Sequence, residues 1–194
     1  MKKRIAVFAS GSGSDFQSII DGVESGAINA EIVMCVASKE GIFAIERAEK
    51  HNIRSAVFSL ADYNSKAEMF EEIAKHMDTL LVDYIVLAGY LTILPADFVS
   101  QYKNRIINIH PALLPKFGGV GFYGMNVHRA VIASGDKVSG ATVHFVDSGV
   151  DTGAIIAQIE VPVMDDDSAE ELQKRVLIAE HKLLPQAIAK VCKP

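Results

Sequence analysis

The sequence predicts an α/β fold, with a doubly wound, mostly parallel sheet that ends in a C-terminal β-hairpin and one long final helix. Residues 4–10 form a continuous apolar run, which is typical of a strand buried on both faces. Strand-like and helix-like segments then alternate up to residue 110, as in parallel sheets with crossover helices. Two later strand patterns flank the turn-rich segment 147–153, which predicts the hairpin.

Length and composition favour one domain covering residues 1–194. The chain is 49% hydrophobic and 22% charged, which is an ordinary globular composition. Its net charge of −5 argues against nucleic acid as a partner, because nucleic acid binding needs a basic surface. No apolar run is long enough to cross a membrane, and no signal-peptide pattern follows Met1. Cys35 and Cys192 form neither a disulfide framework nor a metal site, so we expect a reducing cytoplasm and no metal.

The spacing of apolar residues predicts the elements in order. Strands are expected at 4–10, 30–38, 55–59, 83–89, 106–110, 140–146 and 154–161. Helices are expected at 16–25, 42–51, 65–81, 95–102, 126–134 and from 168 to near the end. The first helix has Ser14 or Asp15 as its expected cap, and Ser168 with Glu171 forms a capping box for the last one. The last helix is expected to bury Leu172, Val176, Ile178, Ala179, Leu183 and Leu184.

A glycine-rich turn joins the first strand to the first helix, with the sequence Gly11-Ser12-Gly13-Ser14-Asp15. Its bare backbone N–H groups lie at the positive end of a helix, where phosphate binds well. The turn is neither a P-loop nor a dinucleotide fingerprint, since it lacks the Gly-Lys-Ser/Thr ending and a third glycine at the right spacing. A phosphate site and a plain tight turn both fit this pattern.

The stretch from Arg105 to Pro115 carries the clearest chemistry. Alternation along its strand points Asn108 and His110 to one side, at the carboxyl end where open α/β sheets bind ligands. An Asn can donate a hydrogen bond to an oxyanion, and a His can transfer protons near neutral pH. His144 and Asp151 also fall at strand ends or loops, and a carboxylate can hold an imidazole in its charged form. These residues fit direct acyl transfer to an amine of the substrate. The alternative is that Asn108 and His110 are a purely structural polar pair at the end of a strand.

Two further segments each have two interpretations. The apolar run Tyr90–Leu94 follows a strand end, and such runs are usually core, although this one could line a pocket for a flat ring. The segment Lys116–Gly124 has four glycines and is either a surface connection or a mobile lid. We read His128 and Arg129 as ordinary helix residues.

Over nearly its whole length the chain resembles the folate-dependent formyltransferase family, and within it the phosphoribosylglycinamide formyltransferases. The motifs that carry the resemblance are Gly-Ser-Gly-Ser at 11–14, Ala-Gly-Tyr-Leu-Thr-Ile-Leu at 88–94, Ile-Asn-Ile-His-Pro-Ala-Leu-Leu-Pro at 107–115, and Val-His-Phe-Val at 143–146 before Asp151-Thr-Gly153. The resemblance implies a Rossmann-like fold, as a monomer or homodimer, that transfers a formyl group from 10-formyltetrahydrofolate to the amine of glycinamide ribonucleotide in purine biosynthesis.

The resemblance also implies residue roles. Asn108 and protonated His110 would stabilise the oxyanion, and Asp151 would raise the pKa of His110. The substrate's phosphate would contact Gly11, Ser12, Gly13, Ser14 and Asp15, and its ribose Glu180. The folate would contact Lys66, Leu91, Thr92, Ile93, Leu94 and Asn108. Asp15 stands where the family usually has Asn, Thr92 where many members have Arg, and the loop 118–124 is longer than in some members.

Four alternatives stay open from the sequence. A formyltetrahydrofolate hydrolase usually has an extra N-terminal regulatory domain, and none precedes Ile5 here. A methionyl-tRNA formyltransferase has a C-terminal domain and a basic surface, whereas this chain is acidic. A non-catalytic nucleotide-binding module would use the turn 11–15 alone and leave Asn108, His110 and Asp151 without a role. Formyl transfer to a different amine also fits the same residues.

Overall fold

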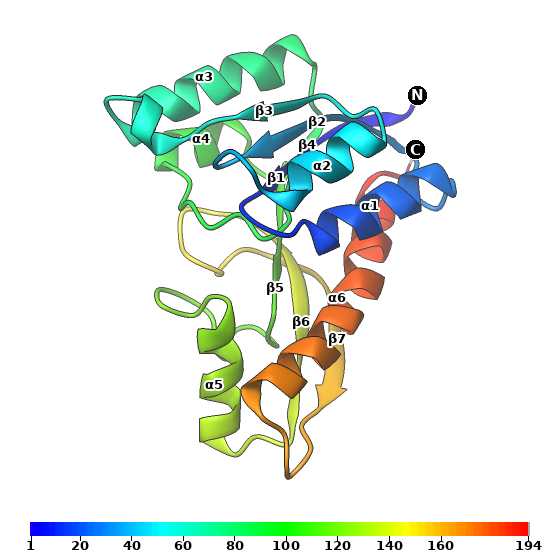
Figure 1. The fold of residues 1–194 in the computed structure, drawn as a ribbon, viewed down its shortest axis with the longest axis vertical. Helices are drawn as coiled ribbons and strands as arrows, with labels where there is room; N and C mark the ends of the chain where they lie inside the picture. The colour runs from blue at the N-terminus through cyan, green and yellow to red at the C-terminus, as the bar shows by residue number, and fades with distance from the viewer. Residues whose placement is uncertain (194) are drawn as a thin grey trace.

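The computed structural model describes residues 1–193 and shows one seven-stranded sheet covered by helices (Figure 1). The strands are β1 (Lys3–Ala9), β2 (Ala30–Ala37), β3 (Ser55–Val57), β4 (Tyr84–Leu87), β5 (Ile106–His110), β6 (Val138–Phe145) and β7 (Ile155–Pro162). The helices are α1 (Ser14–Glu24), α2 (Phe43–Lys50), α3 (Lys66–Thr79), α4 (Ala96–Gln101), α5 (Met125–Ser134) and α6 (Ala169–Val191), with a 3₁₀ turn at Leu60–Asp62. The predicted α/β class, hairpin and long final helix are confirmed.

The strand order is β3-β2-β1-β4-β5-β6-β7, with the first five strands parallel. β6 runs antiparallel to β5, and β7 antiparallel to β6, so the C-terminal hairpin extends the edge of the sheet. The chain moves outward in opposite directions from β1 and β4, which lie side by side. A doubly wound sheet binds ligands at this switch point, outside the carboxyl ends of its strands.

Each face of the sheet has its own apolar core. Alternation along β1 sends Ile5, Val7 and Ala9 into a core with α1, α2 and α6, while Ala6 and Phe8 enter a second core with α3 and α4. Figure 1 shows α6 running diagonally beside β6 and β7, with α1 against its C-terminal half. This packing brings the N-terminal turn of the sequence close to the last helix.

The helix caps and one buried position differ from expectation. Gly13, in the left-handed conformation with φ 66°, is the N-cap of α1, and no side chain caps this helix, so the prediction of Ser14 or Asp15 as cap is wrong. Position 13 needs a glycine for two reasons. Its φ is positive, and a Cβ there would lie 2.9 Å from Ala44 Cα. The capping box of α6 is confirmed. Ile178 is 58% exposed, so its predicted burial is wrong, and the buried face of α6 includes Glu180 instead.

Three further findings concern the described residues alone. Cys35 and Cys192 are both buried free thiols. Within residues 1–193, no group of three His, Cys, Asp or Glu side chains is arranged to hold a metal ion. None of the helices in that range combines the length and the apolar character needed to cross a membrane.

Candidate active site

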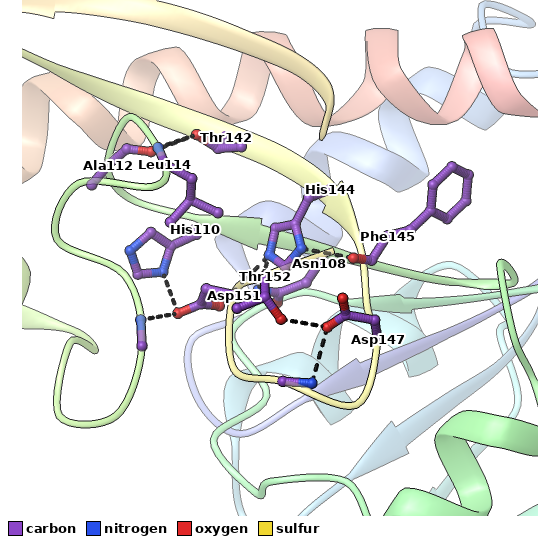
Figure 2. Close-up of polar contacts among 12 residues, drawn as sticks. Asn108, His110, Ala112, Leu114, Thr142, His144, Phe145, Asp147, Asp151 and Thr152 are labelled. Atoms are coloured by element: carbon purple, nitrogen blue, oxygen red, sulfur yellow. Dashed lines mark hydrogen bonds and ion pairs between the residues drawn. The ribbon is translucent and has the colours of Figure 1, made fainter. Parts of the chain in front are cut away.

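Four polar side chains from three parts of the fold meet at the carboxyl end of β5 (Figure 2). Asn108 and His110 come from β5, His144 comes from the neighbouring β6, and Asp151 comes from the loop of the hairpin. We call these four residues the polar cluster. The antiparallel register pairs Asn108 with His144 directly, which is why two residues 36 apart in sequence reach each other.

Asp151 lies between the two histidines. Its carboxylate oxygens are 3.4 Å from His110 Nδ1 and 3.6 Å from His144 Nε2, and the backbone N–H of Gly119 donates to it at 3.1 Å. Asp151 adopts φ 58°, a strained conformation for a residue with a Cβ and one often found at functional sites. The hairpin loop that positions it is tied internally, because Asp147 accepts hydrogen bonds from Gly149 N (3.0 Å) and Thr152 Oγ1 (2.6 Å).

The tautomers of the two histidines follow from their backbone partners. His110 Nε2 lies 2.7 Å from the Phe117 carbonyl, which only accepts, so this nitrogen carries hydrogen. His144 Nδ1 lies 2.8 Å from the Phe145 carbonyl for the same reason, which leaves Nε2 to accept from Asn108 Nδ2 at 3.1 Å. A neutral His110 therefore turns its Nδ1 lone pair toward Asp151, and protonation at Nδ1 creates an ion pair there.

Burial decides the charge state of His110. Desolvation lowers the pKa of His110 below its ordinary 6.5, and the nearby charge of Asp151 and the Phe117 carbonyl raise it only in part. Asp151 acts in the expected direction, but the net shift of the His110 pKa in the substrate-free protein is downward. A protonated His110 during the reaction stays a prediction. Burial also acts against ionisation of Asp151, yet its partners His144, His110 and Gly119 N–H together lower its pKa, and it is ionised at neutral pH.

A pocket of about 300 Å³ opens beside the polar cluster. One wall is the segment after β4 and the other is the hairpin loop 146–151, while Asn108, His144 and Asp151 lie among the lining residues. Leu91 and Ile93 are 66% and 61% exposed and form pocket wall. Tyr90 also lines the pocket but is buried in the core beside α3 and α4, so the run serves both. Leu91, Thr92, Ile93 and Leu94 all line the pocket, whereas Lys66, the first residue of α3, does not.

The turn 11–15 lies at the switch point beside the segment that follows β4. Ser10 N donates to the Gly89 carbonyl at 3.2 Å, and Leu91 N donates to Ser10 Oγ at 3.1 Å, so the two strand ends are joined. The first intrahelical bond of α1 runs from Gln17 N to Gly13 O, which leaves the N–H groups before it without helical partners. Arg47 donates to the Ser12 carbonyl at 2.9 Å and so fixes the turn from the α2 side.

Asp15 does not point toward this cradle of N–H groups as a phosphate ligand would. Its side chain is 14% exposed and lies 3.7 Å from His181 Nε2 of α6, with its Oδ1 lacking a hydrogen bond. Glu180, the residue before His181, is 8% exposed. Burial raises the pKa of Asp15 to about 6, and burial together with the charge of Asp15 raises that of Glu180 well above 4.5.

Sequence reasoning missed the environment of His128. This residue is 2% exposed on the inner face of α5 with Nδ1 unpartnered, and burial, then the nearby His110, lower its pKa to about 4. The signal was present, since Val131 stands one helical turn after His128 on the same face. Sequence reasoning also missed that the loop 116–124 contacts the site. The Phe117 carbonyl accepts from His110, and the Gly119 N–H donates to Asp151.

Comparisons with known proteins give one consistent family. Residues 3–188 match the family model described as formyl transferase. A chloroplastic phosphoribosylglycinamide formyltransferase of Arabidopsis thaliana is 43% identical over 98% of this chain and 66% of its own length. A phosphoribosylglycinamide formyltransferase of Haemophilus influenzae is 40% identical over 96% of this chain and 85% of its own length. The crystal structure of glycinamide ribonucleotide transformylase 1 from Geobacillus kaustophilus, 38% identical, superposes with a TM-score of 0.93 over the full length of both chains.

Some curated relatives are longer than this chain. It spans just under two thirds of the Arabidopsis protein's length, at 66%. The range that matches the family model, residues 3–188, includes the polar cluster and the residues that line the pocket beside it.

Proposed function

We propose that this chain, which belongs to the formyl transferase family, transfers a formyl group from 10-formyltetrahydrofolate to the primary amine of glycinamide ribonucleotide in purine biosynthesis. The single observation that carries the proposal is the polar cluster at the end of a pocket with an apolar wall. A flat folate ring fits such a wall, and its formyl group would then reach Asn108. Relatives named phosphoribosylglycinamide formyltransferase match nearly the whole chain, and they support the choice of amine.

Asn108 is the proposed oxyanion donor. As the amine attacks the formyl carbon, negative charge develops on the formyl oxygen, and an amide N–H already oriented toward the pocket stabilises it. The contact with His144 Nε2 fixes which end of the amide carries the N–H groups. Asn108 therefore needs no reorientation at the moment of reaction.

His110 and Asp151 are the proposed proton-handling pair. The attacking amine must lose a proton, and the folate nitrogen must gain one before it leaves. Neutral His110 accepts a proton at Nδ1, directly beside ionised Asp151 at 3.4 Å, and later returns it. Because Nε2 is held by the Phe117 carbonyl, His110 would donate to the oxyanion only after the loop 116–124 releases this nitrogen.

The remaining contacts are proposed from the sequence resemblance and supported by position. The N–H groups of the turn 11–15 would hold the phosphate and Glu180 the ribose, while Leu91–Leu94 would contact the pteridine. Lys66 stays a prediction for the folate tail. We further propose that residues 1–194 act as one formyltransferase domain, without a metal, as a monomer or homodimer in the cytoplasm. The single sheet and the two free thiols support the domain and the location.

The test is an absorbance assay for deformylated folate, run with 10-formyltetrahydrofolate in the presence and absence of glycinamide ribonucleotide. We expect product only when the ribonucleotide is present. Product without it would identify water as the acceptor and the chain as a hydrolase. No product with either mixture, while folate still binds, would mean that the chain uses a different amine, and a protein that binds nucleotide but no folate would be the binding module.

A further inference from the structure

One carboxylate oxygen holds the hairpin loop closed around Asp151. Asp147 Oδ1 accepts from the backbone N–H of Gly149 at 3.0 Å and from Thr152 Oγ1 at 2.6 Å (Figure 2). We call Asp147, Gly149 and Thr152 the loop clamp. Its hydroxyl contact crosses the loop and fixes the residue that directly follows Asp151 in the chain.

The loop around the clamp is closely packed. A Cβ at Gly149 would collide with Thr152 Oγ1, and a Cβ at Gly153 would collide with the Phe145 carbonyl. Phe145 N donates to the Ala154 carbonyl at 2.9 Å, which joins the two ends of the loop. The chain on both sides of the acid of the polar cluster is therefore held by short contacts.

Asp151 needs this support because its own backbone conformation is unfavourable. A residue with a Cβ stays at φ 58° only where the surrounding structure determines it. In this conformation its carboxylate lies 3.4 Å from His110 Nδ1 and 3.6 Å from His144 Nε2. Relaxation of the loop would return Asp151 to an ordinary conformation and withdraw its carboxylate from the two imidazoles.

We infer that Asp147 is a positioning residue, which through the hydroxyl of Thr152 holds the Asp151 carboxylate between His110 and His144. Its effect on turnover rests on the proposed function, whereas its effect on His110 does not depend on which reaction the site performs. Asp147 acts here as a hydrogen-bond acceptor and not as a charge, because both contacts end on one oxygen that an amide also provides.

The pKa of His110 reports where the charge of Asp151 lies. The titratable side chains that face this imidazole are Asp151 from the hairpin loop, His144 from β6 and His128 from α5. Among these three, Asp151 is the anion and raises the pKa of His110, whereas His144 lowers it. Withdrawal of Asp151 should therefore lower the pKa of His110 further.

The first experiment is a pH titration of the full chain, labelled with nitrogen-15 at histidine and followed by NMR without substrate. Asp147→Ala removes the acceptor and should lower the measured pKa of His110. Asp147→Asn loses the charge but keeps the accepting oxygen, so it should retain the pKa of the unchanged protein. Asp165→Ala, which removes an exposed acid paired with Lys137, is the control and should have no effect.

The second experiment is turnover in the formyl-transfer assay. Asp147→Ala should lower kcat by about tenfold or more, because a small displacement of a positioned group is costly. Thr152→Val, which keeps the shape and loses the hydroxyl, should show a similar loss, and Thr152→Ser should retain normal kcat. Added to Asp151→Asn, Asp147→Ala should cost nothing further, since Asp147 acts through Asp151.

KM for the folate separates positioning from direct binding, because Asp147 also lines the pocket. A raised KM with unchanged kcat and an unchanged pKa of His110 would make Asp147 a folate contact and overturn the inference. A loss in Asp147→Asn as large as in Asp147→Ala would assign the effect to charge and overturn it too. If Asp147→Ala does not fold, equal kcat in Thr152→Val and Thr152→Ser would do the same.

The two experiments also separate the inference from the proposed function. A lower pKa of His110 in Asp147→Ala, with no formyl transfer by the unchanged protein, would reject the proposed reaction and keep the inference. Formyl transfer by the unchanged protein, with the same pKa of His110 in both proteins, would keep the reaction and reject the inference.

Discussion

The polar cluster and the two acids Asp15 and Glu180 are both buried groups of titratable side chains, but they are stabilised differently. In the polar cluster, fixed partners reach Asn108, both histidines and Asp151, several of them backbone groups. In contrast, Asp15 Oδ1 and the adjacent His181 Nε2 have no hydrogen-bond partner among the described residues. The first arrangement is preorganised for chemistry, whereas in the second the burial of unpaired polar atoms costs free energy.

The largest expected effect comes from removing the donor of the polar cluster. Asn108→Ala should lower kcat by about a hundredfold to a thousandfold, because one preorganised N–H to the oxyanion is lost. Steady-state turnover of 10-formyltetrahydrofolate with glycinamide ribonucleotide measures it. Asn64→Ala, at an exposed site where the Asn64 side chain donates a hydrogen bond to Glu68, is the control and should retain normal turnover. Near-normal kcat in Asn108→Ala would show that this amide is not the oxyanion donor.

Asp151→Asn should lower kcat by on the order of a hundredfold, since protonated His110 loses its counter-charge. The amide oxygen still accepts the Gly119 N–H, so the fold should persist. Asp165→Asn, which removes an exposed ion pair with Lys137, should leave turnover unchanged. Unaltered kcat in Asp151→Asn would remove this carboxylate from the mechanism.

The pH profile of the same reaction sharpens the assignment of His110. Because the proposed proton acceptor is neutral His110, turnover should fall as pH drops through the pKa of this residue, which burial places below 6.5. Asp151 raises that pKa, so in Asp151→Asn the acid limb should move to still lower pH. A profile in which turnover instead declines as pH rises past neutrality, with the limb lost in a His110 variant, would mean that protonated His110 is the active form.

Asp15→Asn should stabilise the protein. The pKa of Asp15 rises from 3.8 to about 6 on folding, which corresponds to ~3 kcal/mol at most at 1.36 kcal/mol per unit. A raised carboxyl pKa destabilises the folded state above the unfolded value, so the gain should be full above about pH 6 and vanish near pH 4. Urea unfolding at both pH values measures it. Asp21→Asn should show no such difference, and a destabilised Asp15→Asn at pH 8 would contradict the cost assigned to this buried acid.

A smaller effect is expected behind the polar cluster, where Thr142 supports the chain segment after His110. Thr142 Oγ1 donates to the Ala112 carbonyl (2.6 Å) and accepts from Leu114 N (3.0 Å) (Figure 2). It also accepts from Gln158 Nε2 (2.9 Å). Thr142→Val should cost about 1–3 kcal/mol of unfolding free energy, because buried polar groups lose their partner. Thermal unfolding measures it against the exposed Thr79→Val, and equal stability of both variants would show that the segment is held by other contacts.

Periodicity and motifs predicted the fold well because both cores obey them. The alternation of β1 and the helical spacing of α6 give the same apolar faces in sequence and structure, with Ile178 as the exception. The prediction of the cap residue failed at α1. Gly13 occupies the N-cap there, and a larger residue would collide with Ala44. That constraint comes from packing between α1 and α2, which no local pattern contains.

The sequence predicted which residues form the site, but it could not predict the charge state of those residues. Strand alternation placed Asn108 and His110 together, and the motif pointed to Asp151. The net charge of His110 depends on burial against a neighbouring carboxylate, which requires the fold. The same holds for Asp15, whose carboxylate lies near His181 because α1 packs against α6, and not because of its position in the turn.

The most direct test of the account follows the formyl group itself. Using 10-formyltetrahydrofolate labelled with carbon-13 at the formyl carbon, NMR of the reaction with glycinamide ribonucleotide reports where the label goes. We predict that it appears as a formamide on the ribonucleotide, and that Asn108→Ala slows this transfer by about a hundredfold or more. Label recovered as formate, or transferred at the same rate without the Asn108 amide, would contradict the account.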